Sequence, residues 1–158
     1  MTMADTVGYA LALTDVDFSI LRHRHSSSSR ETAHQAGVTE DSLAKAVALR
    51  DQIGPLLAVL PADRELDLGA LQSALRRPAL RMMTEDELGE VFFDCEKGAV
   101  PPLGPDYRVP TIVDTAFENR PDIYFEAGDH EDLVHVSGTS FHKLVRGAEF
   151  LEISNARG

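Results

Sequence analysis

Two apolar stretches of strand length, residues 43–50 and 55–62, lie only four residues apart in this chain. The residues between them, Asp51 to Gly54, have the composition of a tight turn. Parallel strands need a crossover connection of a dozen or more residues, so strands joined this closely pair antiparallel. The sequence therefore predicts a β-hairpin over residues 43–62, within a sheet that is at least partly antiparallel.

Helix and strand patterns are intermixed along the rest of the chain. Ser28 with Glu31, and Thr84 with Glu87, have the spacing of a capping box, and Asp67 can cap a third helix. Several strands are joined by turns too short for a parallel crossover, which favours an α+β fold with a mixed, largely antiparallel central sheet and flanking helices. The expected helices are residues 3–13, 29–36 (closed by Gly37), 67–77, 84–92 and 140–145, and the further strands are 17–25, 110–114, 122–127, 133–136 and 150–153.

The charge balance restricts how this chain can bind nucleic acid. The chain has 15 Lys and Arg residues and 26 Asp and Glu residues, which give a formal net charge of −11. This charge argues against binding along a DNA or RNA backbone. Because salt screens charges within about 8 Å, a small basic patch could still hold a few phosphates at one end of an RNA. The candidate patches are Arg22, Arg24 and Arg30, and Arg76, Arg77 and Arg81.

The length of 158 residues predicts a single domain over residues 1–158. Apolar runs such as residues 56–62 are far shorter than the roughly 20 residues of a membrane helix, and the N-terminal residues do not have the pattern of a signal peptide. A lone cysteine, Cys95, cannot form an internal disulfide. We therefore expect a cytoplasmic protein that contacts no membrane.

The histidines are the candidate metal ligands. His23 and His25 alternate on an expected strand and would face the same way, so with His34 they could bind zinc. Their surroundings are rich in arginine and have no carboxylate at ligand spacing, so we predict no metal and no cofactor. His130 lies with three acids in residues 128–132, after a strand, where a turn could direct it at a cleft.

Two features suit the chemistry of an ester. Lys45 is the only charge between Asp41 and Arg50, in a strand expected to be buried, so its amine must reach water or serve a buried anionic partner. Residues 98–104 read Gly-Ala-Val-Pro-Pro-Leu-Gly, a rigid loop in which glycine lets backbone amides approach a ligand and proline fixes the shape. Such a loop can donate hydrogen bonds to an ester oxygen without a catalytic side chain.

Six short segments follow one another in a recognisable order. They are residues 28–38, Leu43-Ala44-Lys45-Ala46-Val47, Leu66-Asp67-Leu68, residues 98–104, Val113-Asp114 and Ala127-Gly128-Asp129-His130. In this order the chain resembles the YbaK and prolyl-tRNA-synthetase-associated domain family, which contains trans-editing aminoacyl-tRNA deacylases and the inserted editing domain of bacterial prolyl-tRNA synthetases. The lysine strand followed by Gly-x-x-x-Pro-x-Gly is the most specific part of the match, which runs from about residue 20 to the end.

The resemblance implies a partly barrel-like sheet and an aminoacyl-tRNA hydrolase. Such an enzyme would remove a small amino acid, such as Ala, Ser, Thr or Cys, from mischarged tRNA without a cofactor. Its candidate partners are the acceptor end of aminoacyl-tRNA and an aminoacyl-tRNA synthetase. The catalytic positions match Lys45, Gly98 and Pro102, and the substrate-binding positions match Ala46, Ala99, Val100, Pro101, Gly104, Gly128 and His130.

Two departures leave the substrate open. Ala46 stands where alanine-specific editing domains often have asparagine, and residues 92–96 differ from the Thr-Gly found before the loop in the cysteine-editing branch. Two other functions also stay open. One is a non-catalytic module that keeps the pocket and recruits an RNA or a synthetase, and the other is a metal-dependent hydrolase that uses His23, His25, His34 or His130.

Overall fold

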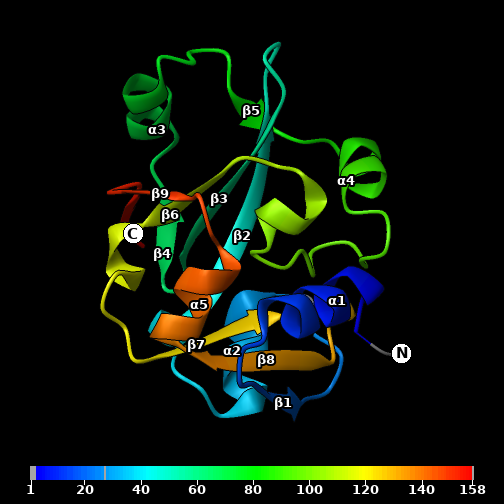
Figure 1. The fold of residues 1–158 in the computed structure, drawn as a ribbon. Helices are drawn as coiled ribbons and strands as arrows, with labels where there is room; N and C mark the ends of the chain where they lie inside the picture. Colours follow the sequence, from blue (N-terminus) through cyan, green and yellow to red (C-terminus); the bar gives the residue numbers. More distant parts are fainter. Residues whose placement is uncertain (1–2, 27, 158) are drawn as a thin grey trace.

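The computed structural model describes residues 3–26 and 28–157, and its centre is one large β-sheet (Figure 1). The strands are β1 (Ser19–Arg22), β2 (Leu43–Arg50), β3 (Pro55–Pro61), β4 (Arg64–Leu66), β5 (Arg81–Met82), β6 (Thr111–Asp114), β7 (Asp122–Glu126), β8 (Asp132–Ser137), β9 (Glu149–Leu151) and β10 (Ser154–Ala156). The order in the large sheet is β1-β8-β7-β2-β3-β6-β9, with β5 paired to β2, while β4 and β10 form a two-stranded sheet.

The β2–β3 hairpin is the centre of the sheet, as the sequence predicted. Its register runs from Ala44 opposite Pro61 to Arg50 opposite Pro55. On its other edge β2 pairs in parallel with β7, and β3 pairs in parallel with β6. The β7–β8 and β1–β8 pairs are antiparallel. The sheet is therefore mixed and mostly antiparallel, which confirms the expected fold class.

The described residues form five α-helices: α1 (Asp5–Thr14), α2 (Ser29–Ala36), α3 (Leu68–Leu75), α4 (Glu85–Val91) and α5 (Gly138–Leu144). The cap signals define three of them. The Ser28 hydroxyl accepts from the amide of Glu31, Asp67 accepts from Ala70, and Thr84 and Glu87 form a complete capping box. Short 3₁₀ turns occupy Glu40–Ser42, Gly104–Tyr107 and Thr115–Phe117.

The two faces of the sheet carry different helices. Because side chains alternate along a strand, Ala44 and Ala48 of β2 point into the largest core, which contains residues of α1 and α5. In Figure 1 these two helices lie in front of β7 and β8. Leu49 points to the opposite face, where it packs with Leu71 of α3. Lys45 precedes Leu49 by four positions on the same strand, so its side chain lies on this second face.

Several expected boundaries were wrong. The strand expected at residues 17–25 is limited to β1, so His23 and His25 lie beyond it. Strand alternation therefore does not make these two side chains face the same way. The strand expected at residues 150–153 is replaced by β9 and β10, which belong to different sheets. The sequence pattern also missed β4 and β5.

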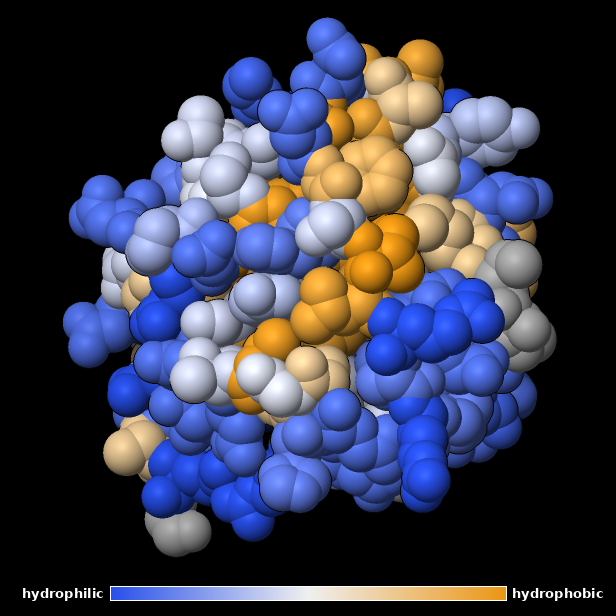
Figure 2. Space-filling view, turned by 90° about the horizontal axis from the view of Figure 1, so that it is seen from below, coloured by the Kyte–Doolittle hydropathy of each residue, from blue (hydrophilic) through white to orange (hydrophobic). Residues whose placement is uncertain are grey.

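Apolar side chains also gather on one outer side. Figure 2, which views the molecule from below, shows an apolar band across this face. The elements on this side, α1 and the edge strand β1, carry the exposed side chains of Leu13 and Ile20. Within residues 3–26 and 28–157, no helix combines the length and apolar character needed to span a bilayer.

Candidate functional site

The loop of residues 98–104, called the Gly98 loop below, is held at the carboxyl end of β7. The amide of Glu96, just before the loop, donates to the carbonyl of Gly128 at 2.8 Å. Ala99, Pro101 and Pro102 are buried, whereas Gly98 is exposed with φ of +78°. A glycine is favoured here because other residues rarely adopt positive φ. The loop is thus held by its buried prolines and is accessible to solvent at Gly98.

The Gly98 loop lies against His130. A Cβ atom placed on Gly98 would lie 3.3 Å from Cε1 of His130. His130 itself has φ of +59°, an uncommon value for a non-glycine residue, and its Nε2 contacts the carbonyl of Lys97. Because a carbonyl oxygen can only accept, Nε2 carries a proton in this contact. The turn therefore fixes the position of the His130 ring against the loop.

The Gly98 loop contains backbone N–H groups that are not used in hydrogen bonds among the described residues. Within the described part of the chain the amide of Ala99 donates to the carbonyl of Glu96, whereas the amides of Gly98 and Val100 donate to no other group of the protein. Pro101 and Pro102 have no amide hydrogen. Two N–H groups, one on each side of Ala99, thus have no partner among the described residues, and an oxygen atom that reached them could accept their hydrogen bonds.

A hollow of about 540 Å³ opens beside this contact, lined by His25, Cys95, Glu96, Lys97 and His130. The ring of His25 lies 5.1 Å from that of His130, and its Nε2 lies 3.5 Å from a carboxylate oxygen of Glu96. Burial raises the pKa of the Cys95 thiol to about 12. Cys95 is therefore a neutral thiol at pH 7 and a poor nucleophile.

The remaining glycines and Ala46 have packing roles. A Cβ atom on Gly128, whose φ is +95°, would lie 2.8 Å from that of Ala4. On Gly104 it would overlap the hydroxyl of Thr111 at 1.7 Å. Ala46 and Val100 both pack against the largest core. These residues bring the loop close to the sheet.

Lys45 lies apart from the Gly98 loop. Its Nζ donates to the carbonyl of Arg64 in β4 at 2.8 Å. Burial lowers the pKa of Lys45, and so does the nearby charge of Arg157, while Glu65 and Asp63 oppose them. In the described residues no hydrogen bond or ion pair joins Lys45 to Gly98 or His130. The structure thus brings Gly98, Gly128 and His130 together and places Lys45 in a second cluster.

Glu126 lies between the two clusters and was not a candidate from the sequence. It follows Phe125, which pairs with Ala44, so Glu126 of β7 and Lys45 of β2 are neighbours on the same face. Its side chain is buried, and its Oε1 accepts from the hydroxyl of Thr32 at 3.1 Å. Burial raises the pKa of Glu126 to about 7, with the charge of Asp129 adding to it and Thr32 opposing. The available signal was an acid that follows the apolar residues Ile123, Tyr124 and Phe125 of an expected strand.

The three N-terminal histidines do not converge as the sequence argument supposed. His23 is buried with Nδ1 on the carbonyl of Arg24, whereas His25 is exposed beside Glu96, and His34 is exposed on α2. In the part of the chain that is described, no group of three or more His, Cys, Asp or Glu side chains could hold a metal ion.

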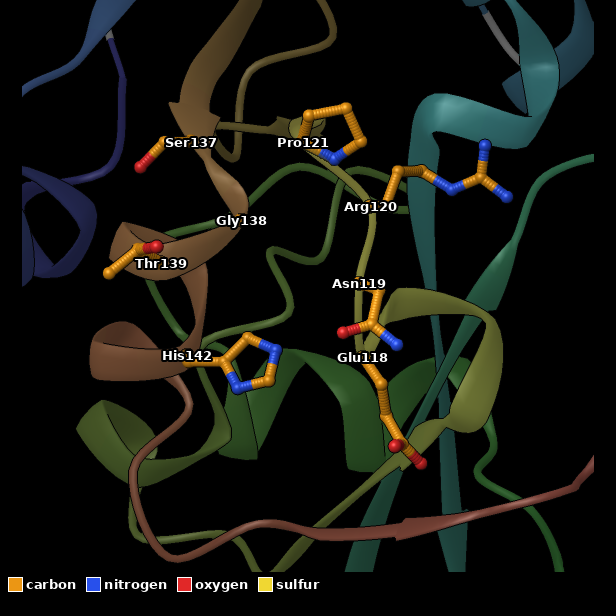
Figure 3. Close-up of a pocket in the computed structure, with 8 residues that line it drawn as sticks. All are labelled: Glu118, Asn119, Arg120, Pro121, Ser137, Gly138, Thr139 and His142. Carbon is orange, nitrogen blue, oxygen red and sulfur yellow. The ribbon is translucent and has the colours of Figure 1, made fainter.

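A different hollow, of about 560 Å³, lies where β7 begins and α5 starts (Figure 3). In Figure 3, Arg120 points away from Thr139 and His142. Its guanidinium contacts Asp41 at 3.1 Å, and His142 contacts the carbonyl of Phe117. None of the residues lining this hollow is a candidate from the sequence.

The family model of the aminoacyl-tRNA editing domain matches residues 23–144 of this chain. The chain belongs to this family. The match includes Lys45, the Gly98 loop and His130, so the resemblance inferred from sequence is confirmed.

Relatives agree with this assignment. A proline–tRNA ligase of Leptospira interrogans serogroup Icterohaemorrhagiae serovar copenhageni (strain Fiocruz L1-130) is 28% identical over 128 residues, which cover 80% of this chain and 22% of the ligase. A proline–tRNA ligase of Leptospira borgpetersenii serovar Hardjo-bovis (strain JB197) is 31% identical over 121 residues, or 76% of this chain and 20% of the ligase. The editing domain therefore spans about a fifth of the length of these relatives.

Among solved structures, a candidate trans-editing enzyme for prolyl tRNA synthetase superposes with a TM-score of 0.81 at 22% identity, over 96% of both chains. A scaffold protein used for computational epitope grafting gives 0.84 at 18% identity, over 97% of both chains. These similarities establish a shared fold.

Proposed function

We propose that this editing domain hydrolyses the ester bond of a mischarged aminoacyl-tRNA. The observation that carries the proposal is the contact between the Gly98 loop and His130. The exposed start of the loop lies against His130, which also lines a hollow of about 540 Å³, and the amides of Gly98 and Val100 have no partner among the described residues. The family match supports the same chemistry.

The proposed reaction needs few side chains. An aminoacyl ester is already activated, so a positioned water and donors for the developing oxyanion are sufficient. The amides of Gly98 and Val100 would donate to the carbonyl oxygen while water attacks the carbonyl carbon. The bond to the ribose oxygen then breaks, and that oxygen takes up a proton. A neighbouring ribose hydroxyl could assist, and His130 would orient the amino acid.

Lys45 would act at the anionic end of the substrate. The free amino group of an aminoacyl ester is cationic and is repelled by a lysine. Lys45 already lies beside Arg64 and Arg157, a setting that suits a phosphate or the ribose of the terminal adenosine. The acceptor end of the tRNA is thus the proposed partner.

A synthetase is the second proposed partner. The curated relatives are proline–tRNA ligases that are about five times longer than their matched segment. A candidate trans-editing enzyme for prolyl tRNA synthetase shares the fold of this chain. We propose that this chain acts on tRNA released by a synthetase.

A deacylation panel tests the proposed function. tRNA charged with Ala, Ser, Thr, Cys or Pro is mixed with excess protein, and the loss of each ester is followed beside protein-free controls. One missing methylene changes selectivity by only about 1–3 kcal/mol, so two neighbouring small amino acids should both be hydrolysed at different rates. A protein that binds these tRNAs and leaves every ester at its spontaneous rate would instead be the non-catalytic module.

A further inference from the structure

A hollow lined by arginine lies on the second face of the sheet. It has a volume of about 670 Å³ and is lined by Arg30 of α2, Arg64 of β4, Arg157, Asp63 and Ala156. Arg157 also lowers the pKa of Lys45, so its charge reaches the amine of that residue. Three guanidinium groups from distant parts of the sequence thus meet beside Lys45, in a chain of net charge −11.

These arginines keep donors that the protein does not use. Arg30 approaches Glu40 with its Nε at 3.4 Å, and 67% of its side chain is exposed. Arg64 binds Ser154 through Nε and one terminal nitrogen, and Arg157 binds Glu40 and the carbonyl of Ala62 through its two terminal nitrogens. A guanidinium has five N–H donors, so each arginine can still bind an anion.

The acids around the hollow hold the arginines in place without neutralising them. Glu40 contacts both Arg30 and Arg157, whose hydrogen bonds and charges lower the pKa of Glu40. Asp63 also lines the hollow. Together with Lys45, the three arginines outnumber the nearby carboxylates of Glu40, Asp63 and Glu65, and arginine binds phosphate oxygens in a bidentate way. The hollow is therefore suited to phosphate groups.

We propose that this hollow binds the phosphates of the unpaired 3′ end of a transfer RNA. A cationic groove that follows the backbone is how proteins hold single-stranded nucleic acid without reading its sequence. Lys45 at its edge would continue the same line of positive charge toward the ester. The inference rests on the proposed function for the identity of the RNA.

The test uses uncharged RNA, so its result does not depend on hydrolysis. A labelled acceptor-stem hairpin with its unpaired 3′ nucleotides, and a blunt hairpin without them, are titrated with protein at several salt concentrations. The variant Arg30→Gln/Arg157→Gln removes two charges from the hollow. A control, Arg108→Gln/Arg146→Gln, removes two exposed charges that do not line it. Arg64 is kept because it joins β4 to β10.

Each single-strand phosphate contact contributes about 0.7 to the slope of log K against log salt. For the tailed hairpin the hollow variant should lose about 1.4 from this slope, while the control keeps the wild-type slope. Arg30→Lys/Arg157→Lys should restore most of it, and the blunt hairpin should not distinguish hollow variant from wild type. Thermal melting shows whether each variant is folded.

An unchanged slope in the folded hollow variant, or an equal loss in the control, would overturn the inference. Equal losses on tailed and blunt hairpins would also overturn it, since the duplex would then be the ligand. If the proposed deacylation fails, ester hydrolysis is absent whatever these slopes are. If only this inference fails, esters are hydrolysed, but the hollow variant and wild type have the same salt slope on the tailed hairpin.

Discussion

The backbone of Gly98 lies against the ring of His130, so that a Cβ atom on Gly98 would be 3.3 Å from Cε1 of the histidine. This contact joins the start of the Gly98 loop to the turn after β7. It places the amide of Gly98 beside a histidine whose Nε2 is bound to the carbonyl of Lys97.

Gly98→Val should lower the single-turnover deacylation rate about a hundred-fold, the cost of a lost oxyanion donor. Valine opposes the φ of +78° and would press on His130. Gly147→Val is the matched control, because Gly147 has φ of +79° and a Cβ atom placed on it would meet no described atom within 4 Å. Both variants lose thermal stability, and a normal rate in folded Gly98→Val would remove the loop from the mechanism.

Lys45→Met should reduce kcat/KM about ten- to a hundred-fold, since a charged hydrogen bond to substrate is worth roughly 1.5–3 kcal/mol. Methionine keeps the apolar stem of this half-buried side chain, so the fold should persist. Lys143→Met, an exposed substitution on α5, is the control. Deacylation kinetics with both variants check this, and equal kcat/KM values would mean that Lys45 serves only the carbonyl of Arg64.

Glu126→Gln should change the pH dependence of stability. The folded pKa of about 7 lies above the ordinary value of 4.5, so folding takes up a proton between these values. The associated stability is present below pH 4.5 and is lost as pH rises through 7, by up to roughly 3 kcal/mol. The free energy of unfolding, measured in urea at pH 5 and pH 8, should be higher for the variant relative to wild type at pH 8 than at pH 5. A constant difference would place Glu126 in solvent-like surroundings.

Cys95→Ala should keep the deacylation rate, because burial holds the Cys95 pKa near 12 and leaves the thiol protonated at pH 7. Iodoacetamide should modify native protein slowly and urea-unfolded protein quickly. Rapid alkylation of native protein with matching loss of deacylation would instead make Cys95 a nucleophile.

Local signals in the sequence predicted the strongest elements. Helix α2 runs from Ser29 to Ala36 as expected, since Ser28 caps its start and Gly37, with φ of +71°, ends it. The β2–β3 hairpin follows from four turn residues between apolar stretches. Short strands could not be predicted in this way, because β4, β5 and β10 have only two or three residues and depend on partners distant in sequence.

The candidate site, too, could be predicted from the sequence only in part. Composition pointed to the Gly98 loop and to Lys45, but no sequence pattern could show that they lie in separate clusters with Glu126 between them. Arg77 and Arg81, expected as a basic patch, are bound to Asp51 and Glu87. Arg30 instead meets Arg64 and Arg157, which only the pairing of β4 with β10 brings together.

The most direct test of the deacylase assignment is a single-turnover time course in EDTA. Alanyl-, seryl-, threonyl- or cysteinyl-tRNA is mixed with excess wild-type protein, and free amino acid and intact tRNA are measured together. If the chain is a deacylase, both products appear faster than in protein-free buffer for at least one of these esters, and Gly98→Val slows their release. Release at the spontaneous rate for every ester, or activity that returns only with added zinc, would contradict it.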